Sequence, residues 1–101
     1  MIRTFKYLTA LFRSMQEVIT ARLLYHLRKK NVIGAKHTHY DALKFGFPKH
    51  LGKEVESAAK ELIKKGWLIT KPTNYGLQVS LNKNRLMEIE SFIKRALGFD
   101  F

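Results

Sequence analysis

The spacing of the apolar residues changes within the chain, and this change limits the possible folds more than any other feature. Up to Gly66 most apolar residues recur at helical spacing, whereas between Trp67 and Leu81 they recur with a period of about two. Residues 72–76, Pro-Thr-Asn-Tyr-Gly, interrupt this second pattern and are typical of a hairpin turn. The sequence therefore predicts a mainly α fold that contains a small β-hairpin.

The first third of the chain is predicted to be helical. The segment before Gly34 contains no Gly or Pro, and its apolar residues recur at helical spacing. Ser14 followed by Glu17 has the spacing of a capping box, in which the two side chains bind free amides at the start of a helix. We therefore expect a short helix over 1–13 and a second from Met15 to Lys30, with Gly34 ending the helical region.

The middle of the chain is expected to hold two further helices. Residues 35–37 are predicted to form an extended link, after which Thr38 could cap a brief helix that includes Leu43 and Phe45. A turn over 46–48 follows, and Pro48 suits the first position of the next helix. That helix is expected to run to about Lys65, where Gly66 stops it.

The last predicted helix and the first are both rich in apolar residues. Asn82 or Asn84 is expected to cap the last helix, over 83–97, and Gly98 ends it. These outer apolar residues are Phe5, Leu8, Leu11 and Phe12 at one end, and Phe92, Ile93, Leu97, Phe99 and Phe101 at the other. They either pack on each other within one chain or form the seam of a homodimer or a partner site.

The composition bounds the class of protein. With 101 residues, of which 46% are hydrophobic, the chain fits a single domain over 1–101 that can build its own core. It has no Cys, which excludes disulfides, thiolate zinc sites and Cys nucleophiles, and suits a cytoplasmic location. The apolar stretch from Tyr7 to Phe12 is too short to span a membrane or to serve as a secretory signal.

One continuous run of the sequence resembles a known domain. Residues 51–67, LGKEVESAAKELIKKGW, followed by LITKPTNYGLQVSL, resemble the recognition helix and wing of winged helix-turn-helix domains. The likeness is greatest to the small basic winged-helix proteins of archaea and covers about 15–82. It implies a winged helix-turn-helix core with additional N- and C-terminal helices, over 1–13 and 83–97.

The net charge indicates a polyanionic partner. The chain has 19 Lys and Arg against 8 Asp and Glu, a formal charge of +11. Nucleic acid, DNA or RNA, is the first candidate, an acidic protein is the second, and an anionic membrane surface is the third.

The predicted helix from Pro48 to Lys65 has one apolar face and one basic face. At about 100° per residue the apolar side holds Leu51, Val55, Ala58, Ala59 and Leu62. The opposite side holds Lys49, Lys53, Lys60 and Lys64, flanked by His50 and Ser57 and interrupted by Glu56. A winged-helix protein would lay this stripe in a DNA major groove or along an RNA backbone. Because the helix carries no Arg, Asn or Gln, we expect little direct reading of bases.

The predicted hairpin turn is a second candidate for contact with nucleic acid. Lys71, Thr73, Asn74 and Tyr75 lie near its tip, where a wing would touch a minor groove or phosphates. Tyr75 could stack on a base. In the alternative interpretation, Asn74 and Gly76 only satisfy the geometry of the turn and Tyr75 packs on the hairpin.

Most of the excess charge lies before the predicted recognition helix. Residues 1–36 contain eight Lys and Arg against one Glu, a net +7. A second contact surface is therefore predicted on the helix from Met15 to Lys30. Its candidate residues are Arg22, Arg28, Lys29 and Lys30. Such a surface would suit a protein embedded in folded RNA.

The sequence offers no catalytic or metal-binding motif. His26, His37, His39 and His50, with Asp41, lack a clear set of three ligands, so they are interpreted as polar residues of links. There is no Gly-rich phosphate loop, serine elbow or triad. We therefore expect a protein that is not an enzyme and that needs no cofactor.

Three functions agree with these features. The first is a winged-helix DNA-binding protein that acts in transcription or chromatin as a dimer. The second is an RNA-binding structural component of the small ribosomal subunit. The third is a protein-interaction module for an acidic partner.

Overall fold

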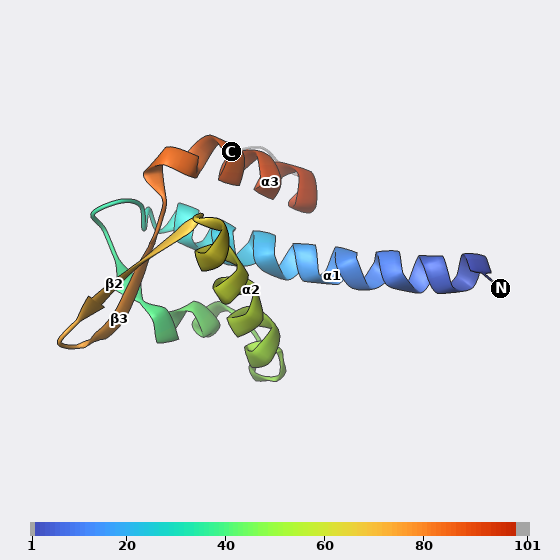
Figure 1. The fold of residues 1–101 in the computed structure, drawn as a ribbon, viewed down its shortest axis with the longest axis horizontal. Helices are drawn as coiled ribbons and strands as arrows, with labels where there is room; N and C mark the ends of the chain where they lie inside the picture. The colour runs from blue at the N-terminus through green and yellow to red at the C-terminus, as the bar shows by residue number, and fades with distance from the viewer. Residues whose placement is uncertain (1, 99–101) are drawn as a thin grey trace.

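The computed structural model describes residues 2–98, with the side chains of 15–98. The fold is mainly helical, with a small antiparallel sheet of three strands. Its helices are α1 (Ile2–Lys29), α2 (Gly52–Lys65) and α3 (Leu86–Leu97). In Figure 1, α3 lies along one side of α1 and α2 lies on the other, while the hairpin extends past the C-terminal end of α1. Within the described part of the chain, no helix combines the length and apolar character needed to cross a bilayer.

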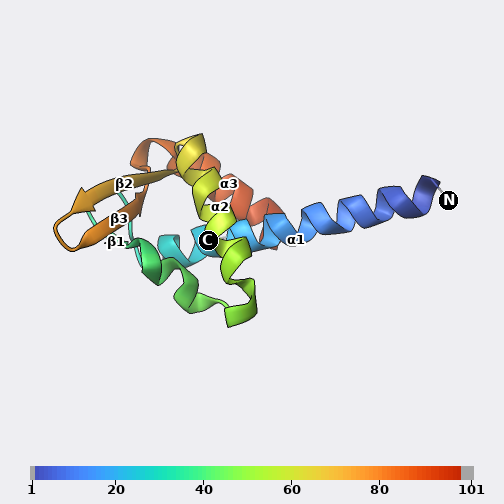
Figure 2. The ribbon, with the colours of Figure 1, turned by 60° about the horizontal axis from the view of Figure 1, so that its bottom comes forward.

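Helix α1 is continuous, so the predicted break at Ser14 is wrong. Ser14 and Glu17 lie in its interior, where backbone amides are already bonded within the helix and a capping box has nothing to cap. The helix also ends before Gly34. Asn31 adopts a left-handed φ of 59°, and the Val32 amide donates to the Leu27 carbonyl at 2.9 Å. The N-terminal half of α1 extends away from the other elements (Figures 1 and 2).

The link after α1 contains a strand that the sequence did not predict. Strand β1 (Thr38–His39) pairs antiparallel with β3, with Thr38 opposite Val79. Thr38 is therefore a strand residue and the prediction that it caps a helix is wrong. The predicted brief helix does follow, as a 3₁₀ helix over Tyr40–Gly46.

The predicted hairpin is confirmed. Strands β2 (Leu68–Thr73) and β3 (Gly76–Leu81) pair in register from Leu68 opposite Leu81 to Thr73 opposite Gly76. The turn is shorter than predicted because Pro72 and Thr73 belong to β2. The Thr73 hydroxyl donates to the Gly76 carbonyl at 2.8 Å and accepts from the Tyr75 amide at 3.2 Å, which closes the turn.

The element before the hairpin begins with a 3₁₀ turn, Lys49–Leu51, and continues as α2 to Lys65. Pro48 precedes this turn in an extended conformation, with ψ of 146°, so it is not the first helical residue. Gly66 ends α2 as predicted, with a left-handed φ of 84° that favours glycine.

Asn82 joins three elements and caps the 3₁₀ turn that leads into α3, whereas Arg85, directly before α3, makes no side-chain cap bond. Its amide donates to the Trp67 carbonyl at 2.9 Å, and its side-chain Nδ2 donates to the Gly66 carbonyl at 2.8 Å. Its Oδ1 accepts from the Asn84 amide at 3.0 Å, within a 3₁₀ turn that leads into α3. Gly98 ends α3, as predicted, with φ of 74°.

The core lies where α1, α2, α3 and the sheet meet. Its largest fully buried side chains include Leu23, Leu24, Val55, Leu68, Val79, Leu81, Ile89 and Ile93. Of the predicted apolar face of α2, Val55, Ala58, Ala59 and Leu62 are buried, whereas Leu51 is half-buried against the core.

The apolar face of α3 is covered by the core of the same chain, whereas its predicted packing on the apolar residues at 5–12 stays a prediction. Ile93 is buried in the core, and the Phe92 ring packs edge-on against Trp67 at 5.7 Å between centroids. Leu97 is half-buried against the same core. The other outer apolar side chains, at 5–12 and at 99 and 101, lie outside the described residues, and a homodimer stays a prediction.

Gly46 is placed where only a glycine fits against α1. A Cβ at Gly46 would lie 2.5 Å from Cε1 of His26, whose ring also packs on Phe47 at 5.3 Å between centroids. We expect Gly46→Ala to destabilise the fold by about 1–3 kcal/mol, because the imidazole must leave its place. Urea unfolding measures this loss. The matched control is Gly52→Ala, since a Cβ at Gly52 meets no atom within 4 Å. Equal stabilities of the two variants would contradict the prediction.

Candidate nucleic-acid interface

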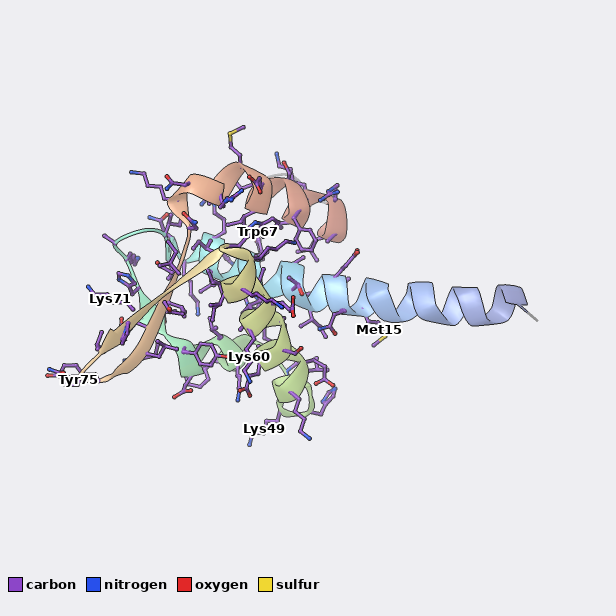
Figure 3. All side chains as sticks on the ribbon, in the orientation of Figure 1. Met15, Lys49, Lys60, Trp67, Lys71 and Tyr75 are labelled. Carbon is purple, nitrogen blue, oxygen red and sulfur yellow. The ribbon has the colours of Figure 1, made fainter. Side chains whose placement is uncertain are left out.

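The basic face of α2 is exposed along its length. Val55, Ala58, Ala59 and Leu62 turn the opposite side of α2 into the core, so the polar side faces solvent. Lys53, Ser57, Lys60 and Lys64 lie on this exposed side, and Lys49 and His50 extend it into the preceding 3₁₀ turn. We call these six residues the lysine face. Figure 3 shows Lys49 near the start of this element and Lys60 farther along α2.

Glu56 lowers the charge of this surface. One carboxylate oxygen of Glu56 lies 3.5 Å from Lys60 Nζ, and the other lies 3.6 Å from Lys44 Nζ. Lys44 belongs to the 3₁₀ helix over Tyr40–Gly46. Burial raises the pKa of the nearby Tyr40 hydroxyl, and the Glu56 carboxylate raises it further. Glu56 therefore offsets two ammonium groups, while no ion pair is recorded for Lys49, Lys53 or Lys64 among the described residues.

Replacing Glu56 with glutamine is expected to strengthen binding of a polyanion. The change removes one negative charge beside the lysine face and frees the ammonium groups of Lys44 and Lys60. We expect roughly a 3- to 10-fold higher affinity for duplex DNA at low salt, with the gain shrinking as salt screens it. Fluorescence anisotropy at two salt concentrations measures this. A gain that does not depend on salt, or a loss of affinity, would contradict it.

The hairpin tip is open to solvent. Tyr75 is 85% exposed, so its ring does not pack on the hairpin as one alternative proposed. Asn74 and Lys71 are also exposed, whereas Thr73 is half-buried and its hydroxyl is used within the turn. In Figure 3, Tyr75 lies at the end of the hairpin and Lys71 lies on it. The tip thus offers one aromatic ring and one ammonium group.

The proposed second basic surface is smaller than the sequence suggests. Arg22, Lys29 and Lys30 are exposed, but Arg28 is half-buried and its Nε donates to Glu90 of α3 at 2.8 Å. Sequence reasoning missed this ion pair because the two residues lie 62 positions apart. Arg28 therefore ties α1 to α3.

The histidines do not gather at one place. His26 packs against Phe47, and burial of its ring lowers its pKa, with neighbouring Lys and Arg side chains lowering it further. His39 lies in β1 and His50 in the lysine face. Over residues 15–98, no group of three or more His, Cys, Asp or Glu side chains could hold a metal ion.

An exposed aromatic ring near the lysine face was not predicted as a site. Phe45, which the sequence placed only in the brief helix after Thr38, is 82% exposed. It lines a pocket of about 440 Å³ together with Lys44, Phe47, Pro48, Lys49 and Gly52. We call this the Phe45 pocket. The signal in the sequence is a phenylalanine that directly follows a lysine and precedes Gly46 and Pro48, in a segment too short for a periodic pattern.

Comparison with known proteins gives no relative for this chain. No protein-family model matches it, and neither a curated protein nor a solved structure matches it.

Proposed function

We propose that this chain is a non-enzymatic winged-helix protein that binds nucleic acid, with duplex DNA as its main target. In this proposal α2 is the recognition helix and the β2–β3 hairpin is the wing. The order of three helices and a small three-stranded antiparallel sheet is compatible with a winged-helix layout. A role in transcription or chromatin follows from such binding.

The exposed lysine face of α2 is the observation that carries this proposal. Four Lys side chains follow one side of the element, and the remaining side is anchored in the core. An ammonium group is a flexible point charge, which suits phosphate oxygens better than the edges of bases. The expected mode is therefore attachment to the sugar-phosphate backbone, with little dependence on base sequence.

A structured RNA, such as that of the small ribosomal subunit, is the second candidate target. Three exposed cations favour an RNA target, because they lie on a different element from the lysine face. They are Arg22 within α1, Lys29 at its end and Lys30 directly after it. A single DNA duplex on α2 does not require them.

The test measures affinity of the full chain for a duplex DNA and for a structured RNA of similar length over a series of salt concentrations. If the four lysines each contact one phosphate, the logarithm of the DNA affinity should fall with that of salt with a slope of roughly −3 to −4. RNA affinity about 100-fold above DNA affinity at matched salt would favour the second candidate. Absence of salt-dependent binding to both would overturn the proposal.

A further inference from the structure

We propose that the Phe45 pocket holds one unpaired nucleobase of a nucleic acid strand that runs along the lysine face. The inference rests on the proposed function and deepens it, because it names a site for a single nucleotide that the lysine face does not provide. The chemistry has two parts, a stacking surface for the base and cations for its flanking phosphates.

The exposure of Phe45 is not explained by the packing of its own segment. Leu43, two residues earlier, is buried, and Phe47, two residues later, is half-buried with its ring against His26. Phe45 lies between them and leaves most of its ring in water. Burying a Phe side chain is worth about 1.5–3 kcal/mol. The fold does not obtain this stabilisation from Phe45, whereas a partner that covers the ring would.

The charge around the pocket selects the kind of partner. Lys44 and Lys49 line it, and none of its described lining residues is acidic. The Glu56 carboxylate lies 3.6 Å from Lys44 Nζ, whereas Lys49 makes no ion pair among the described residues. An apolar protein segment would use the ring but leave the ammonium groups unused. A nucleotide uses both, with its base on the ring and its phosphates near the lysines.

The position and size of the pocket fit a single nucleotide of a longer strand. Lys49 belongs to both the lysine face and the Phe45 pocket, so a backbone that follows α2 reaches the pocket without a gap. A volume of about 440 Å³ lies within the usual range for small-molecule sites, which is roughly 300–1,000 Å³. Gly52 also lines the pocket, and a Cβ there would meet no atom within 4 Å, so packing does not require glycine at this position.

The test compares the parent chain with Phe45→Ala, Phe45→Trp and the control Met87→Ala. Met87 is 85% exposed on α3 and lines no part of the pocket, so it matches Phe45 in exposure and apolar character. The probes are a single-stranded DNA, a fully paired duplex, and the same duplex with one unpaired nucleotide. Affinity is measured by anisotropy over a salt series, and folding is checked by thermal unfolding.

We expect Phe45→Ala to weaken binding of the single strand and of the bulged duplex about 5- to 150-fold, which is the usual loss per stacked base. The paired duplex should change less than about 3-fold, because its bases stay stacked on each other. The salt slope should stay the same, since no phosphate contact is removed. Phe45→Trp should restore binding, and Met87→Ala should leave all three affinities unchanged.

Equal affinities of Phe45→Ala and the parent chain for all three probes would overturn the inference. So would an equal loss on all three, which would indicate a contact that does not depend on an unpaired base. Displacement of the single strand by micromolar AMP would overturn it as well, because the site would then serve a free nucleotide. None of these outcomes would contradict the proposed function, provided that binding by the parent chain depends on the lysine face.

Discussion

Replacing Lys49, Lys53 and Lys60 with alanine is expected to reduce the affinity for duplex DNA about 100-fold at 0.15 M salt. Each phosphate contact contributes about 0.9 to the salt slope, which corresponds to roughly a 5-fold effect on affinity at this salt concentration. The slope itself should become shallower by at most about 2.7, the value for three full phosphate contacts. Lys60 is expected to contribute less than the other two, because Glu56 already lies 3.5 Å from its ammonium group.

The measurement is a salt series on the triple variant, with thermal unfolding as the check on folding. These side chains are exposed, so stability should change by less than about 0.5 kcal/mol. A charge-matched comparison separates position from total charge. Lys49/Lys53→Ala removes two charges from the lysine face, and Lys83/Arg95→Ala removes two exposed charges from the region of α3. The same loss for both double variants would show that total charge, and not the lysine face, determines binding.

Leu62→Ala is expected to cost about 2–5 kcal/mol of the free energy of unfolding. The Leu62 side chain is 2% exposed and lies on the buried side of α2, within the core cluster that also contains Val55 and Ala59. Removing it leaves a cavity that these neighbours can fill only in part. For a domain of this size such a loss is a large fraction of the total stability.

Urea unfolding of the full chain gives this free energy, and Met87→Ala is the control. Met87 is exposed, so its truncation should change stability by less than about 0.5 kcal/mol. A cost below about 1 kcal/mol for Leu62→Ala would show that the core does not depend on this face of α2.

The hairpin and α2 could be predicted because their signals are local. The alternation of Leu77, Val79 and Leu81 marks the strand in which these residues lie. Gly66 likewise marks the end of the helix that directly precedes it. The prediction at Ser14 failed for the same reason. A capping-box spacing also occurs by chance inside a helix, and nothing local distinguishes a continuing helix from a new one.

Long-range contacts explain most of what the sequence did not reveal. Strand β1 has two residues, which is too few for a pattern, and it exists because β3 offers it an edge, with Thr38 opposite Val79 and His39 opposite Gln78. The pairing of Arg28 with Glu90 likewise depends on how α3 docks on α1. The lysine face could be found from the helical period, whereas the Phe45 pocket could not, because its walls come from two short 3₁₀ segments, the link between them and the first residue of α2.

The hydrogen bonds of Asn82 have a consequence for the cooperativity of unfolding. Through one residue the end of α2, the base of the hairpin and the turn before α3 are linked by bonds to Gly66, Trp67 and Asn84. Displacing Asn82 at this point breaks its bonds to all three elements. Helix α2, the β2–β3 hairpin and α3 are therefore coupled at this junction, and we expect them to open there together rather than one at a time.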